Sequence, residues 1–377
     1  MAVTFDISPE KEASASQYLY RQLFVTPKAT SRREVDLSGK TAIVTGSNIG
    51  IGLECARQLL DLGLTKLILA VRDGSKGELA RQDLASGRDL DSNAIEVWKL
   101  DMSSYGSITK FAERAVKEIE HLDIAILNAG VYHTTEIFNN NTGYEESAQI
   151  NCLSTILLAI LLLPAMKPEQ SQPRQRPGRI VIVSSEMAGW AQFPERKESR
   201  ILPTLKKKVD TFSLGEQYGR SKLLAQLAMV ELAKRVPSSA VTIDAANPGF
   251  CYGSGLQRHM AGTVLGLIFA VYVRLIGRSA ALGARSLVDA AVNHGEEVHG
   301  QYIGDCTLKP LAPIIYTSEG ERVCASFWEE LMEEFSFSRA ADIIKSLNSG
   351  KYSRIQPNVR DAAFYHLLWN LSLSRNQ

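Results

Sequence analysis

The sequence predicts an α/β protein with one doubly wound parallel sheet of about seven strands. Short aliphatic, β-branched runs alternate with longer segments whose apolar residues recur at helical spacing. The short runs are continuously apolar, which is typical of parallel strands buried on both faces of a sheet. With 377 residues, of which 45% are hydrophobic, the chain is long enough to bury a large core.

The alternation begins at Lys40. Residues 41–45 form an apolar run closed by a glycine, and Leu53, Ala56 and Leu59 then share one side of a helix over 51–62. The remaining elements follow in order: strand 66–71, helix 77–85, strand 95–100, helix 108–119, strand 124–127, helix 144–163, strand 179–183, helix 217–236, strand 241–246, helix 281–292 and strand 300–303.

We expect this pattern to form a single domain over residues 38–335. Residues 1–37 precede it as an N-terminal extension, in which 17–24 has helical spacing and 27–33 has the composition of a linker. A charged insertion, 195–213, is expected to form either a lid or a surface loop. Residues 336–377 form a C-terminal tail that is charged and shows no regular pattern.

The composition excludes several classes of protein. The 42 Lys and Arg residues balance the 41 Asp and Glu residues, so no basic field would attract nucleic acid. The five cysteines are scattered and form no Cys-x-x-Cys pair, which argues against a disulfide framework or a zinc site and favours a reducing compartment. Because residues 1–12 do not have the pattern of a secretory signal, we expect a cytoplasmic protein.

Two apolar stretches bear on membrane association. Residues 152–163 stop at Pro164, well short of the ~20 residues that a membrane span needs, so they predict a buried helix. Residues 261–273 are also too short to span a membrane. They predict a lid or packing helix over an apolar pocket, and the alternative is peripheral contact with a membrane surface.

A glycine-rich turn joins the first strand to the first helix. Glycines at this junction let the backbone turn tightly and approach a phosphate, and the helix N-terminus offers free N–H groups. The spacing is Gly-x-x-x-Gly-x-Gly, and its strand–turn–helix context predicts a Rossmann-type dinucleotide site. The expected cofactor-binding residues of this turn are Gly46, Ser47, Asn48, Ile49, Gly50 and Gly52.

The end of the second strand indicates which dinucleotide binds. An acid there would bind the ribose 2′-hydroxyl, whereas an arginine would accommodate a 2′-phosphate. Arg72 lies nearer the strand end than Asp73, and a guanidinium matches a phosphate with two parallel hydrogen bonds. We therefore expect NADP(H) in preference to NAD(H).

Two further strand ends are candidates for the same ligand. Asp101, after the third strand, could accept a hydrogen bond from the adenine amino group, or it could cap the next helix. Asn128, Ala129 and Gly130 end the fourth strand, where small residues would leave room for the cofactor. The alternative for these three is a simple turn.

A tyrosine and a lysine one helical turn apart are the candidate catalytic pair. Tyr218 and Lys222 share one face of a helix. An ammonium group nearby, together with the positive charge of the nicotinamide, would lower the pKa of the phenol from about 10, so that it could exchange protons near neutral pH. Ser185, after the fifth strand, could hydrogen-bond a substrate oxygen, and Asn151 is a polar residue at the head of an apolar helix.

Taken in this order, the motifs resemble those of the short-chain dehydrogenase/reductase family, from about residue 38 to 330. The resemblance implies that Tyr218 is the acid/base and that Ser185 polarises the carbonyl. It also implies that Lys222 binds the nicotinamide ribose and lowers the pKa of Tyr218. Asn151 would hold a water molecule in a proton relay, and Pro248 and Gly249, in an Asn-Pro-Gly motif, would border the nicotinamide.

The wider pattern is similar to the retinol-dehydrogenase/carbonyl-reductase branch and its fungal members, which implies NADP(H) and secondary metabolism. The segment 250–255 departs from the family pattern because it lacks a threonine soon after Pro-Gly. Aromatic and apolar candidate pocket walls favour a lipophilic carbonyl or alcohol: Met187, Trp190, Phe193, Phe250 and Tyr252. A non-catalytic dinucleotide-binding regulator is the alternative, and the sequence predicts no particular oligomeric state.

Overall fold

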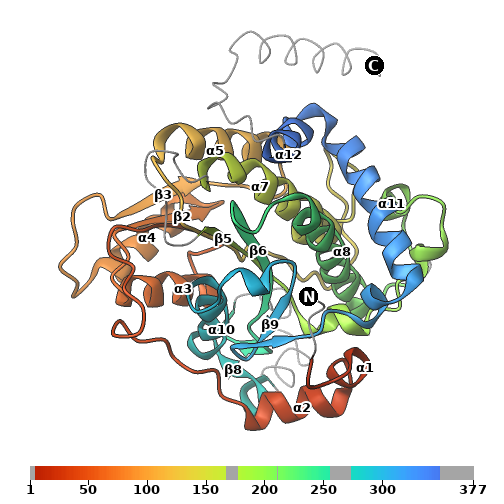
Figure 1. The fold of residues 1–377 in the computed structure, drawn as a ribbon, viewed down its shortest axis with the longest axis horizontal. Helices are drawn as coiled ribbons and strands as arrows, with labels where there is room; N and C mark the ends of the chain where they lie inside the picture. Colours follow the sequence, from red (N-terminus) through yellow and green to blue (C-terminus); the bar gives the residue numbers. More distant parts are fainter. Residues whose placement is uncertain (1–4, 167–176, 210, 255–272, 349–377) are drawn as a thin grey trace.

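The computed structural model describes residues 5–166, 177–209, 211–254 and 273–348. Eight strands form one sheet in the order β10-β9-β6-β5-β4-β1-β2-β3 (Figure 1). All neighbouring pairs are parallel except β9 and β10. The strands are β1 (Thr41–Thr45), β2 (Lys66–Val71), β3 (Ile95–Lys99), β4 (Ile124–Leu127), β5 (Gly178–Val183), β6 (Val241–Asn247), β9 (Tyr302–Gly304) and β10 (Thr307–Lys309).

The doubly wound parallel sheet predicted from the sequence is confirmed, with β10 added as an antiparallel edge strand. The chain builds β1, β2 and β3 outward in one direction, then returns to place β4 on the other side of β1. Ligands of such sheets bind at the carboxyl ends of the strands near this reversal. The glycine turn after β1 and Asn128 after β4 both lie there.

Helices cover both faces of the sheet (Figure 1). One face carries α3 (Gly50–Asp61), α4 (Gly74–Ala85) and α10 (Ala280–Val292), and the other carries α5 (Tyr105–Glu118), α7 (Thr155–Leu162) and α8 (Leu214–Arg235). Strand residues alternate between the two hydrophobic clusters, so Ile43 faces α5, α7 and α8 while Val44 faces α3 and α10. This alternation is why each strand is apolar on both faces.

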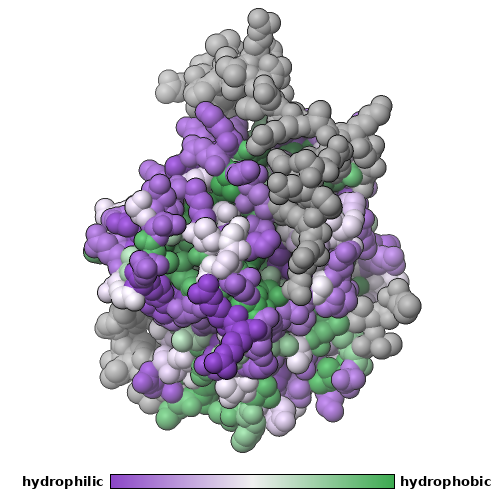
Figure 2. Space-filling model, turned by 60° about the vertical axis from the view of Figure 1, so that its left-hand side comes forward, coloured by the Kyte–Doolittle hydropathy of each residue, from purple (hydrophilic) through white to green (hydrophobic). Residues whose placement is uncertain are grey.

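The N-terminal extension forms two short helices beside the sheet. They are α1 (Pro9–Glu12), capped by Ser8, and α2 (Ala15–Phe24), capped by Ser14. The inner side of α2 is buried, while Leu19, Tyr20, Leu23 and Phe24 are exposed on its outer side. Figure 2 shows hydrophobic surface along the lower edge of the molecule, the edge at which Figure 1 places α2.

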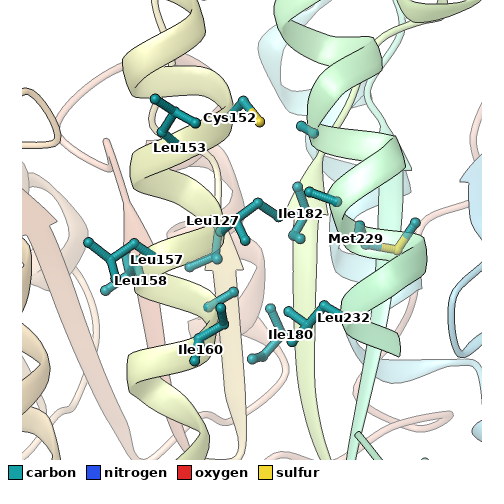
Figure 3. Packing of buried hydrophobic residues seen from close by; sticks show 14 of the residues in the cluster. Leu127, Cys152, Leu153, Leu157, Leu158, Ile160, Ile180, Ile182, Met229 and Leu232 are labelled. Atoms are coloured by element: carbon teal, nitrogen blue, oxygen red, sulfur yellow. The ribbon is translucent and has the colours of Figure 1, made fainter. Parts of the chain in front are cut away.

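The apolar helix predicted over 144–163 lies in the core. The helical residues 146–166 are long and apolar enough to cross a membrane, but 94% of their most apolar window is buried inside the protein. Figure 3 shows Leu157 and Ile160 of α7 packed toward Leu127 of β4 and Ile180 of β5. This burial is expected for a core helix of a soluble fold.

The charged insertion is docked on the protein rather than projecting from it. It contains two short 3-10 turns, η4 (Pro194–Lys197) and η5 (Leu202–Lys206). Ile201, Leu202 and Leu205 are buried, and the backbone N–H groups of Ile201 and Leu202 each donate to the Glu330 carboxylate at 2.8 Å. Glu330 belongs to α11 (Ser318–Glu334), which packs on α8.

The chain after Phe335 was expected to be irregular, and this is wrong for its first part, which forms a further helix, α12 (Ala340–Asn348). Its buried residues join the same hydrophobic cluster as α7: Ala340, Ile343, Ile344 and Leu347.

Candidate active site

The glycine turn after β1 has the geometry that its sequence predicts. Gly46 and Gly50 both have a φ of 64°, a left-handed conformation that side chains disfavour. Gly52 is helical, but a Cβ there would lie 2.5 Å from Asn128 Nδ2 and 2.6 Å from Gly46 O. The turn therefore brings helix α3 against β1 with no space for a side chain at Gly52.

The start of α3 can hold an anion. Its N-cap residue, Ile49, provides no side-chain hydrogen bond, so the first N–H groups of the helix are left for a ligand. Ser47 is fully buried, and its hydroxyl has no hydrogen-bond partner among the described residues. Asn48 is partly exposed beside it. An uncapped helix start, a glycine cradle and an orphaned hydroxyl together fit the pyrophosphate of a dinucleotide.

The residues after β4 brace this turn. Asn128 Nδ2 donates to Thr45 O at 2.9 Å and to Gly46 O at 3.3 Å, and Ala129 N donates to Thr45 Oγ1 at 2.9 Å. Asn128 thus fixes the turn directly, in addition to the predicted role of leaving room for the cofactor. A Cβ on Gly46 would lie 3.0 Å from Ala129 Cα, which shows how closely the two segments approach.

The charged candidates at the ends of β2 and β3 are Arg72, Asp73 and Asp101, and they differ in exposure and in hydrogen bonding. Arg72 is exposed at the end of β2, whereas the carboxylate of Asp73 caps α4 by accepting from Ser75 N and Lys76 N at 3.0 and 3.2 Å. Asp101 accepts from the Ser103 hydroxyl at 2.7 Å and leaves the capping of α5 to Ser104. Asp73 and Asp101 therefore both accept hydrogen bonds from neighbouring residues, while Arg72 is exposed at the strand end.

Tyr218 and Lys222 lie in the first half of α8 and are both buried. The Lys222 ammonium lies 5.7 Å from the centre of the Tyr218 ring. The hydroxyl of Ser185 hydrogen-bonds that of Tyr218. The predicted pair and its serine are thus brought together by the meeting of α8 with the end of β5.

The protein groups alone do not lower the pKa of Tyr218; the expected lowering also involved the positive charge of the nicotinamide. Burial raises the pKa of Tyr218 well above its ordinary value, and the carboxylate of Glu186 raises it further. The Ser185 hydrogen bond opposes these effects, while Lys222 does not contribute. The ammonium donates to the backbone at Val183 O, at 2.8 Å.

Lys222 itself is perturbed. Burial lowers its pKa to about 8. Gly130 lies beside it, since a Cβ on that residue would lie 3.7 Å from Lys222 Nζ and 3.0 Å from Asn151 Oδ1. The lack of a side chain at Gly130 therefore leaves open the space between the ammonium and the Asn151 amide.

Asn151 lies in a π-helical turn, η1 (Gln149–Ser154), a local widening that is frequent at functional sites. Its amide accepts from Val131 N at 2.8 Å, donates to Val131 O at 3.0 Å and donates to Ser221 Oγ at 2.9 Å. Ser221 in turn donates to Tyr218 O at 2.7 Å. Asn151 thus ties the loop after β4 to the catalytic helix.

The Asn-Pro-Gly motif follows β6 on the other side of the site. Asn247 accepts from Gly249 N at 2.9 Å and donates to Glu186 Oε2 at 2.7 Å, so the motif is joined to the residue next to Ser185. Gly249 has a φ of 73°, and Pro248 is buried. The proposed nicotinamide border therefore lies beside Ser185, the candidate catalytic serine.

Sequence reasoning missed two residues of this site. The Tyr132 ring meets the Tyr218 ring edge to face, with centroids 4.8 Å apart, and Glu186 acts electrostatically on Tyr218. The signals available in the sequence were that Tyr132 follows Gly130 by two positions and that Glu186 directly follows Ser185.

Among the predicted pocket walls, Phe193 is fully buried in the core, and Trp190 packs instead on Tyr18 of α2.

Most of the apolar stretch 261–273 lies outside the described residues, so its predicted role as a lid or membrane contact has no structural description. Val273, its last residue, is buried.

Comparison with known proteins identifies the family of this chain. A family model described as short chain dehydrogenase matches residues 40–196. The short-chain dehydrogenase fogG of Aspergillus ruber is 53% identical over 92% of this chain and 99% of its own length. The short chain dehydrogenase/reductase mfmJ of Annulohypoxylon moriforme is 39% identical over 92% of this chain and 99% of its own.

Solved structures share the fold at low identity. The Pseudomonas aeruginosa RhlG/NADP active-site complex matches with a TM-score of 0.50 and 22% identity, covering 71% of this chain and 95% of that one. The carbonyl reductase Sniffer of D. melanogaster matches with a TM-score of 0.51 and 20% identity, covering 73% and 99%. At these identities the likeness extends to the fold.

Proposed function

Because the chain belongs to the short-chain dehydrogenase/reductase family, and so is an oxidoreductase that uses a nicotinamide dinucleotide, we propose its specific reaction. It transfers a hydride between NADP(H) and the carbonyl or alcohol group of a lipophilic small molecule, with Tyr218 as the acid/base. The observation that carries the proposal is the buried phenol of Tyr218, hydrogen-bonded to Ser185 and next to the Lys222 ammonium.

The choice of NADP(H) is supported by the end of β2. Arg72 is exposed there, while the neighbouring carboxylate of Asp73 is used in capping α4 and so is less suited to a ribose 2′-hydroxyl. A guanidinium favours a 2′-phosphate. When bound, the reduced cofactor supplies the hydride; the protein supplies the binding, orientation and proton transfer.

The raised pKa of Tyr218 favours the direction of carbonyl reduction. Its phenol stays protonated at neutral pH and can donate that proton to the oxygen of a substrate carbonyl as negative charge develops. Ser185, hydrogen-bonded to the phenol, can donate to the same oxygen. Lys222 and Asn151, on either side of Gly130, would hold the proton-supplying groups in place.

A lipophilic substrate is supported by the surroundings of Tyr218. The half-buried ring of Tyr132 covers one edge of the phenol, and Met187 lies next to the start of α8. Such walls favour an apolar carbonyl compound over a sugar or an acid. The fungal origin of the relatives supports a substrate from secondary metabolism.

Replacing Tyr218 by phenylalanine tests the proposal. NADPH oxidation with a panel of lipophilic ketones and aldehydes should fall by about 10²- to 10⁴-fold, because a positioned acid is lost. NADPH binding, followed by fluorescence, should change little. Tyr132→Phe is the matched control, since it removes the hydroxyl of the ring packed against Tyr218 and should keep most of the activity. Comparable turnover in the Tyr218 variant would refute the mechanism.

A further inference from the structure

The segment after β6 runs from the catalytic residues to the glycine turn. At its start, Asn247 donates to Glu186, the residue after Ser185, at 2.7 Å. At its end, a Cβ on Gly50 would lie 2.6 Å from Ser254 O. Residues 248–254 therefore connect the two ends of the proposed cofactor site.

The N-terminal helix α2 holds the middle of this segment. The buried amide of Gln22 donates to Phe250 O at 2.8 Å and accepts from Phe250 N at 3.1 Å. One side chain thus satisfies both backbone groups of Phe250, as a neighbouring strand would. Because an amide carries both a donor and an acceptor, glutamine suits this pairing better than glutamate or methionine.

A second contact fixes α2 in this place. Arg278 donates through Nη2 to Arg21 O at 2.6 Å and Val25 O at 2.9 Å, at the C-terminal end of α2, and is paired with Asp305. The backbone N–H of Arg278 also donates to Phe250 O at 2.8 Å. These are hydrogen bonds of a buried charged group, so they hold the helix firmly.

Gly249 is packed closely against the side chains of Gln22 and Arg278. A Cβ on Gly249 would lie 2.9 Å from Arg278 Nη1 and 3.1 Å from Gln22 Oε1. The Asn-Pro-Gly motif is thus packed directly against the side chains that come from, or bind, the N-terminal helix. A small movement of α2 would change the path of residues 248–250.

We propose that α2 is a part of the active site, and that Gln22 is a positioning residue that sets the backbone of 248–254 for hydride transfer. The inference rests on the proposed function, since that segment matters to catalysis through the dinucleotide it borders. The N-terminal extension then acts on the reaction from outside the sheet, through one amide.

The test compares Gln22→Met with Gln17→Met in the full-length protein. Methionine keeps the length of the Gln22 side chain but removes both hydrogen bonds. Gln17 lies on the same helix, half-buried; its backbone N–H donates to Ser14 Oγ, while its side-chain amide makes no hydrogen bond to the described part of the chain. Two quantities are measured: amide hydrogen exchange of residues 247–254 without ligand, and kcat with the NADPH dissociation constant.

In Gln22→Met, exchange at the Phe250 amide should become at least tenfold faster, because its acceptor is lost. The kcat of reduction should fall by about tenfold to a hundredfold, as misplacement of reacting groups commonly causes. The NADPH dissociation constant should change less than threefold, and Gln17→Met should resemble the natural protein. Merely lowered stability would reduce the folded fraction, but not kcat per NADPH-binding molecule.

The results distinguish a failure of the positioning role of Gln22 from a failure of the proposed function. Faster exchange with unchanged kcat would overturn the positioning role while leaving the proposed function intact. If the natural protein oxidises no NADPH with any carbonyl, the proposed function fails, and the exchange experiment still decides whether Gln22 holds the segment. Equal exchange in the two variants would overturn the inference itself.

Discussion

Burial of the Lys222 ammonium lowers its pKa toward neutral pH. One backbone acceptor, Val183 O at 2.8 Å, compensates only part of the cost of removing the charge from water. The pKa of Lys222 is consequently lowered to about 8. Between this value and the higher pKa of the unfolded chain, the unfolded state binds more protons, so this group makes folding more favourable as the pH rises through that window.

The same shift predicts the pH dependence of catalysis. The kcat/KM for carbonyl reduction should be flat from pH 6 to 7 and fall above about pH 8, because the free enzyme then loses the Lys222 charge while Tyr218, whose pKa is raised, stays protonated. Initial rates measured from pH 6 to 10 test this. Lys222→Arg, with a charge that persists over this range, should show lower activity without that fall. A natural profile that is flat to pH 10 would contradict the assignment.

Arg72 gives a second prediction at the residue scale. Arg72→Ala should weaken NADPH binding by at least tenfold and change NADH binding less than twofold, because the 2′-phosphate is present in NADPH alone. Fluorescence titration with both nucleotides measures this. Lys76→Ala, which removes a nearby exposed cation on α4, is the control and should affect both nucleotides little. Equal losses for NADPH and NADH in the Arg72 variant would disprove the 2′-phosphate contact.

Single residues could be identified from the sequence where their chemistry depends on type and spacing. Glycine at Gly46 and Gly50 follows from a backbone that needs positive φ, and the pairing of Tyr218 with Lys222 follows from one helical turn. The direction of the Tyr218 pKa shift could not be predicted. It depends on burial and on Glu186, which are set by the packing of the 3-10 turn η3 (Glu186–Trp190) against α8.

At the scale of elements, the meeting of η3 (Glu186–Trp190) with α8 controls the catalytic geometry. The Ser185 hydroxyl caps η3 by accepting from Met187 N at 3.2 Å, so the serine moves with this turn. Gly219 of α8 lies against the backbone of η3, because a Cβ on Gly219 would be 2.6 Å from Met187 O. The glycine next to Tyr218 is therefore required by the close approach of backbone to backbone.

Gly219→Ala should separate activity from stability. Alanine in a helix is usually more stable than glycine by about 1 kcal/mol, but here its Cβ would push η3 and Ser185 away from Tyr218. We expect kcat to fall by roughly tenfold or more. Gly215→Ala is the matched control, since its Cβ would lie 3.5 Å from Met187 Cε in ordinary contact. Turnover numbers and urea midpoints of both variants check this, and equal kcat values would exclude the clash.

Elements were predictable where the pattern was long or continuous. All seven parallel strands of the eight-stranded sheet were expected, because their apolar runs are typical of buried strands. The antiparallel strand β10 has three residues, partly exposed, and no such run. The π-helical turn at Asn151 was also missed, because it differs from an α-helix in hydrogen bonding rather than in composition.

At the scale of the whole molecule, both ends of the described chain pack onto the domain that lies between them. The α2 helix reaches the segment after β6 through Gln22, and α11 reaches two distant segments through Glu334. The Glu334 carboxylate accepts from Tyr144 Oη at 2.8 Å and from Tyr105 Oη at 3.3 Å. Sequence patterns alone did not reveal these links, because they join residues about two hundred positions apart through single polar side chains.

The last prediction concerns α12, which follows the boundary drawn from the sequence at residue 335. Ile344 is buried in the cluster that contains α7, so Ile344→Ala should lower the free energy of unfolding by about 2–4 kcal/mol. Asp342→Ala, on the exposed side of the same helix, should change it by less than about 0.5 kcal/mol. Urea unfolding followed by tryptophan fluorescence measures both. Identical midpoints would mean that α12 contributes nothing to the core, because a helix that stabilises the fold cannot lose a buried isoleucine without cost.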